Sequence, residues 1–179
     1  MINRKVPLFW YSLYRFNKNP SVFSAHFLRR KFGKEKENYG DLLSKYIVEK
    51  VSKKRTDWCN PKNTSTKHLF AIGSILNLTT EKSIVWGSGI INTNDVVKAS
   101  DFRAVRGPYT RENILHAGKS CPEVYGDPAI LLPQCFNLVC RKSFKLGIIP
   151  HIYDLTIVRK LSSSFFNIPC IQVNYLNMM

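Results

Sequence analysis

The sequence predicts an α/β fold in which helices flank a Rossmann-like sheet of parallel strands. Two short continuous apolar runs, residues 69–72 and 83–86, each lead into a glycine, as buried parallel strands commonly do. Residues 101–108 repeat this pattern. Segments whose apolar residues have helical spacing alternate with the runs, which favours strand-helix-strand units.

The amino-terminal part supplies a first strand and a first helix. The apolar run 6–11 predicts the strand, and the polar, basic and aromatic residues 17–37 are interpreted as an insertion after it. A helix is expected to begin at Asp41, which follows a glycine and is a capping-type residue. The apolar residues at helical spacing after it are Leu42, Leu43, Tyr46, Ile47 and Val51. The Asn-, Pro- and Thr-rich segment 56–66 is expected to be a loop.

The middle of the chain continues the alternation. Pro108 is well placed to open a helix over residues 109–117, because its fixed φ suits the first helical turn. Residues 123–131 are expected to add one more strand and turn.

The carboxyl-terminal part has the pattern of a new unit. A basic stretch precedes residues 145–150, which are typical of a first strand, and a helix over 153–161 and a strand over 168–173 follow. We therefore expect a Rossmann-like domain over residues 1–140 and the start of a second domain over residues 141–179.

The charge of the chain limits its partners only broadly. Lys and Arg number 27 and Asp and Glu 12, which gives a net charge of +15. Such a charge attracts phosphates, acidic polysaccharides, nucleic acids or an anionic membrane surface. No zinc-finger spacing, basic zipper or RNA-recognition signature accompanies it, so we expect solvated basic faces and no nucleic-acid partner. A peripheral membrane contact stays open.

The cysteine count, the spacing of possible metal ligands and the length of the apolar runs exclude several classes of protein and site. Five cysteines without a C-x-x-C pair indicate neither a disulfide framework nor a zinc site, and no His, Asp and Glu cluster has metal-ligand spacing. We expect no metal and no cofactor. The first residues lack a signal-peptide cleavage site, and no run reaches the roughly 18 apolar residues of a membrane span. A cytoplasmic location is therefore expected.

Glycines and arginines at the expected strand ends point to an anion site. Backbone N–H groups near glycine and the guanidinium groups of Arg103 and Arg106 both suit phosphate and carboxylate. Gly87, Ser88 and Gly89 lack the third glycine of a dinucleotide motif, and the chain has no P-loop. Structural turns at the glycines and structural ion pairs of the arginines are the alternatives.

Six ordered segments together carry a more specific signal. They are residues 38–43 (NYGDLL), 71–76 (AIGSIL), 85–89 (VWGSG), 105–110 (VRGPYT), 125–129 (YGDPA) and 147–154 (GIIPHIYD). In this order they resemble the polysaccharide pyruvyltransferase family. Members of that family resemble the two-domain glycosyltransferase-B architecture and transfer the enolpyruvyl unit of phosphoenolpyruvate to sugar hydroxyls, usually as a ketal. The resemblance implies a modifying enzyme of bacterial capsule, exopolysaccharide or lipopolysaccharide.

The resemblance also implies the site residues. Asp41 and His151 are the expected catalytic residues, of which Asp41 would take a sugar hydroxyl's proton or hydrogen-bond the sugar. The alternatives are a helix N-cap for Asp41 and a packing role for His151. The expected residues that bind phosphoenolpyruvate and the saccharide acceptor are Asn38, Gly40, Gly73, Ser74, Gly87, Ser88, Gly89, Arg103, Arg106 and Asp127. Asp127 precedes a proline, so a turn-forming role is its alternative.

The chain departs from the family pattern after Val173, where we find no segment with the serine and histidine that the family's second domain places near the donor. We expect a truncated protein that is inactive alone. Three alternatives remain: a remnant that binds an anionic glycan or a partner without turnover, a glycosyltransferase of the same architecture, and a basic nucleic-acid binder.

Overall fold

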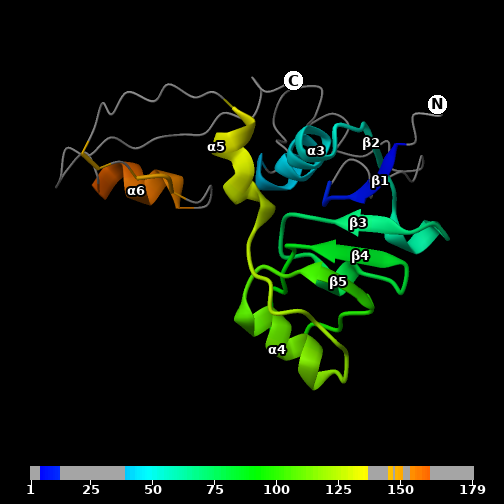
Figure 1. Cartoon of the computed structure of the whole chain (residues 1–179). Helices are drawn as coiled ribbons and strands as arrows, with labels where there is room; N and C mark the ends of the chain where they lie inside the picture. Colours follow the sequence, from blue (N-terminus) through cyan, green and yellow to red (C-terminus); the bar gives the residue numbers. More distant parts are fainter. Residues whose placement is uncertain (1–4, 13–38, 137–144, 147, 151–153, 162–179) are drawn as a thin grey trace, which may run out of the picture. The chain divides into compact units, whose positions relative to one another are not determined.

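The computed structural model describes residues 5–12, 39–136, 145–146, 148–150 and 154–161. The chain divides into two compact units, Met1–Asn137 and Leu138–Met179. In the second unit the structure describes one helix, α6 (Leu155–Leu161), which lies within the segment expected to be helical. The first unit holds a sheet (Figure 1).

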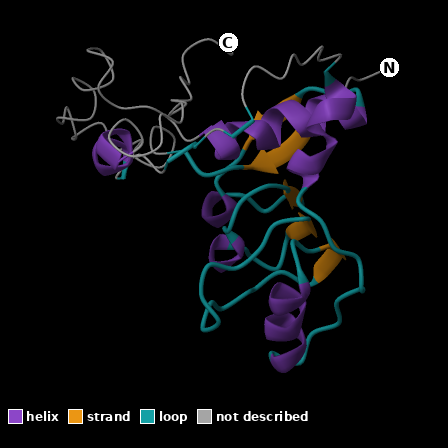
Figure 2. Cartoon of the chain, turned by 90° about the vertical axis from the view of Figure 1, so that its left-hand side faces the viewer, coloured by secondary structure: helices purple, strands orange, loops and turns teal. Residues whose placement is uncertain are grey.

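The sheet has five strands, all parallel, in the order β2-β1-β3-β4-β5. The strands are β1 (Val6–Phe9), β2 (Thr56–Trp58), β3 (His68–Phe70), β4 (Ser83–Trp86) and β5 (Asp101–Ala104). Seen from the side in Figure 2, they follow one another in a twisted row, as parallel strands do. The prediction of an α/β fold with a parallel sheet and flanking helices is confirmed.

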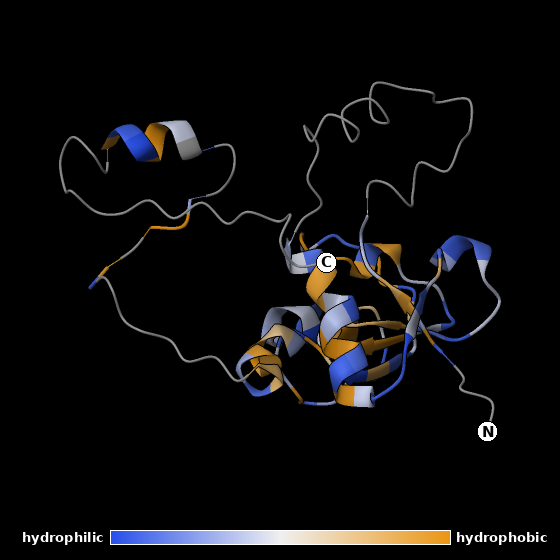
Figure 3. Ribbon diagram, turned by 90° about the horizontal axis from the view of Figure 1, so that it is seen from above, coloured by the Kyte–Doolittle hydropathy of each residue, from blue (hydrophilic) through white to orange (hydrophobic). Residues whose placement is uncertain are grey.

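Strand register builds one continuous apolar row across the sheet. Phe9 is paired with Phe70, Phe70 with Val85, and Val85 with Phe102, and all four side chains are buried. Because successive side chains of a strand point to opposite faces, Leu8 lies on the other face. Figure 3 shows these strands as apolar ribbons among mostly hydrophilic loops. Both faces of the sheet therefore carry apolar side chains that other elements must shield from water.

Helix α3 (Tyr39–Ser52) covers one face at the β1 end of the sheet. Its residues Leu43, Ile47 and Val48 pack with Leu8 and Trp10 in one buried cluster. Two later elements also pack against this cluster, the 3-10 helix η3 (Pro128–Leu131) and the short helix α5 (Leu132–Cys135). The helix begins two residues before the expected start, so Asp41 lies inside its first turn rather than at the N-cap.

The opposite face is covered without a long helix at its centre. The 3-10 helix η2 (Leu76–Leu78), the segment 90–99 and α4 (Pro108–His116) pack there. The shared cluster is made of Leu76, Val85, Ile90, Val97, Ala99, Phe102, Val105, Ile114 and Cys121. Proline opens α4 as predicted, and Figure 1 shows this helix beside β5.

The expectation of a loop over residues 56–66 is wrong, because β2 and the 3-10 helix η1 (Pro61–Asn63) lie within it. Glu49 of α3 accepts hydrogen bonds from both N and Oγ1 of Thr56, each 2.8 Å long. Partial burial raises the pKa of the Glu49 carboxyl, but the Thr56 hydrogen bonds and nearby basic residues bring it below its ordinary value. Trp58 Nε1 donates to the Trp10 carbonyl at 3.0 Å. Tertiary contacts thus place this short edge strand.

Other expectations are met in part or lie outside the described residues. Within residues 123–131, Tyr125 makes a single parallel bridge to Val105 instead of a full strand. The structure describes residues 145–150 only in part, and the insertion over 17–37 and the strand over 168–173 fall outside the described residues. In the described part of the chain, no helix has the length and apolar character needed to cross a membrane.

A buried histidine joins the beginnings of β3 and β4. His68 is 1% exposed, with Nδ1 2.9 Å from the Thr66 carbonyl oxygen and Nε2 2.8 Å from Ser83 Oγ. Because a carbonyl only accepts, Nδ1 carries the proton and Nε2 accepts from the serine hydroxyl. Ser83 Oγ in turn accepts from the backbone N–H of Thr80 at 2.9 Å. Both ring nitrogens of His68, the Ser83 hydroxyl and the Thr80 N–H therefore each have a hydrogen-bond partner.

Replacing Ser83 by alanine is expected to lower the free energy of unfolding by about 1–3 kcal/mol, because it leaves the buried His68 Nε2 and the partly buried Thr80 N–H unpaired. Ser100→Ala, at an exposed position, is the control and should stay within about 0.5 kcal/mol of the parent. Urea denaturation measures both. Equal stabilities of the two variants would contradict the structural role of this pair.

Candidate functional site

The candidate site lies at the carboxyl ends of the strands. The chain runs from β1 outward to β2 and then returns to β3 on the other side of β1, so the strand order reverses between β1 and β3. In open parallel sheets, ligands bind in the crevice outside the carboxyl ends at this reversal. The segment after β3 meets the first turn of α3 at this edge.

The backbone ties these segments together beyond the ends of the strands. Gly89 N donates to Gly73 O at 3.0 Å, which joins the segments after β4 and β3. Arg106 N donates to Ser88 O at 3.2 Å, which joins the segments after β5 and β4. The structure therefore brings Gly73, Ser88, Gly89 and Arg106 together.

Arg106 is held in place at this edge. Its Nη1 donates to Ser74 Oγ, and its Nη2 donates to the Ile90 carbonyl at 2.8 Å. The guanidinium lies over Gly89, where an added Cβ would stand 2.8 Å from Arg106 Cζ. A guanidinium has five N–H donors, and its others have no partner within the described residues. Arg106 is exposed, so these donors can receive an anion from solution.

Asp41 reaches the same segment from α3. Its Oδ1 lies 3.3 Å from where a Cβ on Gly73 would stand, and Gly73 has a φ of +107°, which glycine adopts readily. Asp41 therefore contacts Gly73, and Arg106 contacts the next residue, Ser74. A carboxylate and a guanidinium that are far apart in the sequence thus contact adjacent residues of one segment.

Gly87 is required by packing. Its φ is +98°, and an added Cβ would stand 2.3 Å from Pro128 Cδ and 2.7 Å from Gly126 O. Asp127 does not extend into this contact as a free carboxylate, because its side chain accepts from Ala129 N at 2.9 Å and caps η3. The turn-forming alternative therefore describes Asp127 in this structure, and the segment it stabilises closes over Gly87.

The remaining expected site residues are placed elsewhere or lie outside the described residues. Arg103 is within β5 and forms an ion pair with Asp101, with 2.7 Å between Nε and Oδ1. The structural alternative therefore describes Arg103, which the structure does not bring to Ser74. Gly40 lies in the first turn of α3. Asn38 and His151 fall outside the described residues.

The structure shows that Ser88 is a buried polar residue. Its side chain is fully buried, and its Oγ has no hydrogen-bond partner in the described part of the chain. A buried hydroxyl without a partner is uncommon in folded proteins. The family resemblance implied a binding role for Ser88, but no sequence pattern predicted its burial.

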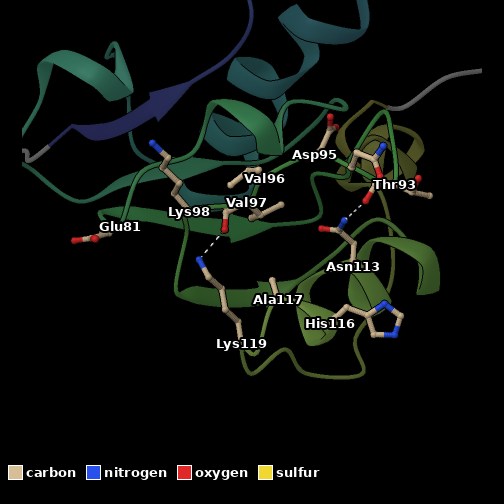
Figure 4. A pocket seen from close by; sticks show the side chains of 11 residues that line it. Glu81, Thr93, Asp95, Val96, Val97, Lys98, Asn113, His116, Ala117 and Lys119 are labelled. Atoms are coloured by element: carbon tan, nitrogen blue, oxygen red, sulfur yellow. Dashed lines mark hydrogen bonds between the residues drawn. The ribbon is translucent and has the colours of Figure 1, made fainter.

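An open depression of about 730 Å³ lies away from the strand-end site (Figure 4). Segment 93–98 and the end of α4 form its walls, and two hydrogen bonds hold these walls together. Asn113 Nδ2 donates to Thr93 O at 2.5 Å, and Lys119 Nζ donates to Val97 O at 2.6 Å. The depression shares no residue with the strand-end site.

Comparisons with known proteins do not assign the chain to a family: no family model, no curated protein and no solved structure matches it. Within the described residues, no group of three or more His, Cys, Asp or Glu side chains could hold a metal ion.

Gly87→Ala is expected to destabilise the protein by several kcal/mol, because a Cβ would collide with the ring of Pro128 in addition to straining the positive φ. Gly118 also has a positive φ, +73°, but open space around it, so Gly118→Ala should cost only about 1–2 kcal/mol. Gly107→Ala, at the N-cap of α4 in extended backbone with open space, should cost at most about 1 kcal/mol. Thermal unfolding ranks the three variants, and an equal loss at Gly87 and Gly118 would refute the packing argument.

Proposed function

We propose that the chain is a polysaccharide pyruvyltransferase-like protein, which uses phosphoenolpyruvate as donor and a bacterial capsule or exopolysaccharide sugar as acceptor. The observation that carries the proposal is the meeting of Asp41 and Arg106 at the adjacent residues Gly73 and Ser74. The family resemblance involves these residues, and their contacts support a common site at the reversal of strand order.

Arg106 is proposed to bind the donor. Phosphoenolpyruvate carries a phosphate and a carboxylate, and a guanidinium matches either group with two parallel hydrogen bonds. Ser74 and the Ile90 carbonyl fix the guanidinium before the donor arrives, which lowers the entropy lost on binding. Phosphoenolpyruvate is a cytoplasmic metabolite, so the proposed reaction belongs to the cytoplasm.

Asp41 is proposed to contact the acceptor. A carboxylate beside the donor site accepts a hydrogen bond from a sugar hydroxyl and can take its proton as the oxygen attacks. Gly73 leaves room for the carboxylate at this position, since a Cβ there would stand 3.3 Å from Oδ1. The two proposed roles differ in charge: the Arg106 guanidinium binds the anionic donor, and the Asp41 carboxylate binds a hydroxyl of the acceptor.

Arg106→Gln is expected to weaken the binding of phosphoenolpyruvate on the order of 10- to 100-fold, since a hydrogen bond to a charged group contributes about 1.5–3 kcal/mol. Arg103→Gln is the matched control, an exposed arginine paired with Asp101 on the same strand end, and should bind the donor as the parent does. Isothermal titration calorimetry with the full chain measures both. Equal losses would show that net charge, and not Arg106, attracts the donor.

Asp41→Asn is expected to weaken acceptor binding about tenfold or more, because the amide keeps the shape of the side chain but loses the charge that strengthens its hydrogen bond to a hydroxyl. Donor affinity should be unchanged. Titration with capsule oligosaccharides and with phosphoenolpyruvate gives the two values. A variant that loses donor affinity, or keeps full acceptor affinity, would overturn the role given to Asp41.

The alternative functions differ in what the same site binds, because the chain alone is expected to be inactive. Saccharide binding without binding of phosphoenolpyruvate would favour a glycan-binding protein. Binding and turnover of a nucleotide sugar in place of phosphoenolpyruvate would favour a glycosyltransferase. Both outcomes use the same purified chain, so they can be compared directly.

A further inference from the structure

The opposite edge of the sheet has a second charged feature. A basic residue comes shortly before every strand: Lys5 before β1, Arg55 before β2, Lys67 before β3, Lys82 before β4 and Lys98 before β5. Because all strands are parallel, their amino ends lie along one edge. Two backbone hydrogen bonds join neighbouring members, from Val6 N to Arg55 O at 2.9 Å and from His68 N to Lys82 O at 3.2 Å.

These residues form a continuous basic rim, which we define with the two lysines before Arg55 as Lys5, Lys53, Lys54, Arg55, Lys67, Lys82 and Lys98. All seven side chains are exposed, and none is in an ion pair with another described residue. Neighbouring strands are about 4.8 Å apart, so the rim extends about 20 Å across the five strands. Glu81, next to Lys82, is an exposed carboxylate beside it.

We propose that the basic rim binds the surface of a membrane that contains anionic phospholipids. Six of its seven residues are lysines, which act as strongly hydrated point charges suited to diffuse attraction by headgroups. Two exposed apolar side chains accompany it, Val51 near Lys53 and Val96 near Lys98. Such side chains suit shallow contact at the headgroup boundary.

The composition of the rim favours a membrane over a nucleic acid. Proteins that hold single strands stack bases on exposed aromatic rings and use arginine forks. The exposed tyrosines in the described part of the chain are Tyr11, Tyr109 and Tyr125, which come after β1, just after β5 and opposite Val105, toward the carboxyl edge. Docking by the rim would leave that carboxyl edge, with Asp41 and Arg106, open to soluble substrates. This inference does not depend on which reaction the carboxyl edge performs.

The test measures sedimentation of the full chain with vesicles. One set contains phosphatidylcholine and phosphatidylserine in equal parts, and the other contains phosphatidylcholine alone. Each basic residue near an anionic membrane strengthens binding about fivefold at moderate salt, so Lys67→Gln with Lys82→Gln should weaken binding about 25-fold. The control removes the same charge elsewhere, with Lys45→Gln on α3 and Lys62→Gln on η1, both exposed, and should bind nearly as the parent does.

The vesicle experiment can support or overturn the proposed membrane binding. Binding that requires phosphatidylserine, weakens with added salt and is lost only in the rim variant supports it. Equal losses in the rim and control variants, equal binding to both kinds of vesicle, or tighter binding to duplex DNA or RNA than to vesicles would overturn it. Circular dichroism checks that each variant is folded. If the double rim variant is unfolded, Lys67→Gln and Lys82→Gln are measured singly, each with an expected loss of about fivefold.

Discussion

The parallel pairing of β1 with β3 is the interaction on which the rest of this structure depends. It places Phe9 against Phe70, with ring centroids 4.9 Å apart and both side chains fully buried. The same pairing creates the reversal of strand order, because β2 lies on the other side of β1. It also sets the segment after β3 beside the first turn of α3, which is how Asp41 meets Gly73.

The two edges of the sheet differ in chemistry because parallel strands separate their beginnings from their ends. Glycines follow β3 and β4 and allow close backbone contacts at the carboxyl edge, whereas lysine or arginine precedes each strand at the amino edge. A compact site and a broad charged surface therefore occupy opposite edges. The anion site proposed at one edge and the membrane surface proposed at the other therefore use different residues.

The glycines at the carboxyl edge act by giving space to other groups. Pro128 fills the space beside Gly87, the Arg106 guanidinium lies over Gly89, and the Asp41 carboxylate contacts Gly73. A glycine motif that suggests direct ligand contact in the sequence here positions two charged side chains instead. The structural turn and the binding role considered from sequence are therefore compatible, since the turn is what places the side chains that would bind.

The sequence by itself determined the α/β class, strands β1, β3, β4 and β5, and helices α3 and α4, because buried strands require short apolar runs and covering helices require a 3.6-residue period. It did not determine β2, whose three residues, Thr56–Trp58, contain no apolar run and owe their place to Glu49 and Trp10. Nor did it distinguish Arg103 from Arg106. Both are arginines near the end of one strand, but only the tertiary structure placed one against Asp101 and the other against Ser74. Local sequence patterns indicate which apolar side chains will be buried. The partner of an exposed charged side chain depends instead on which distant segments the fold brings together.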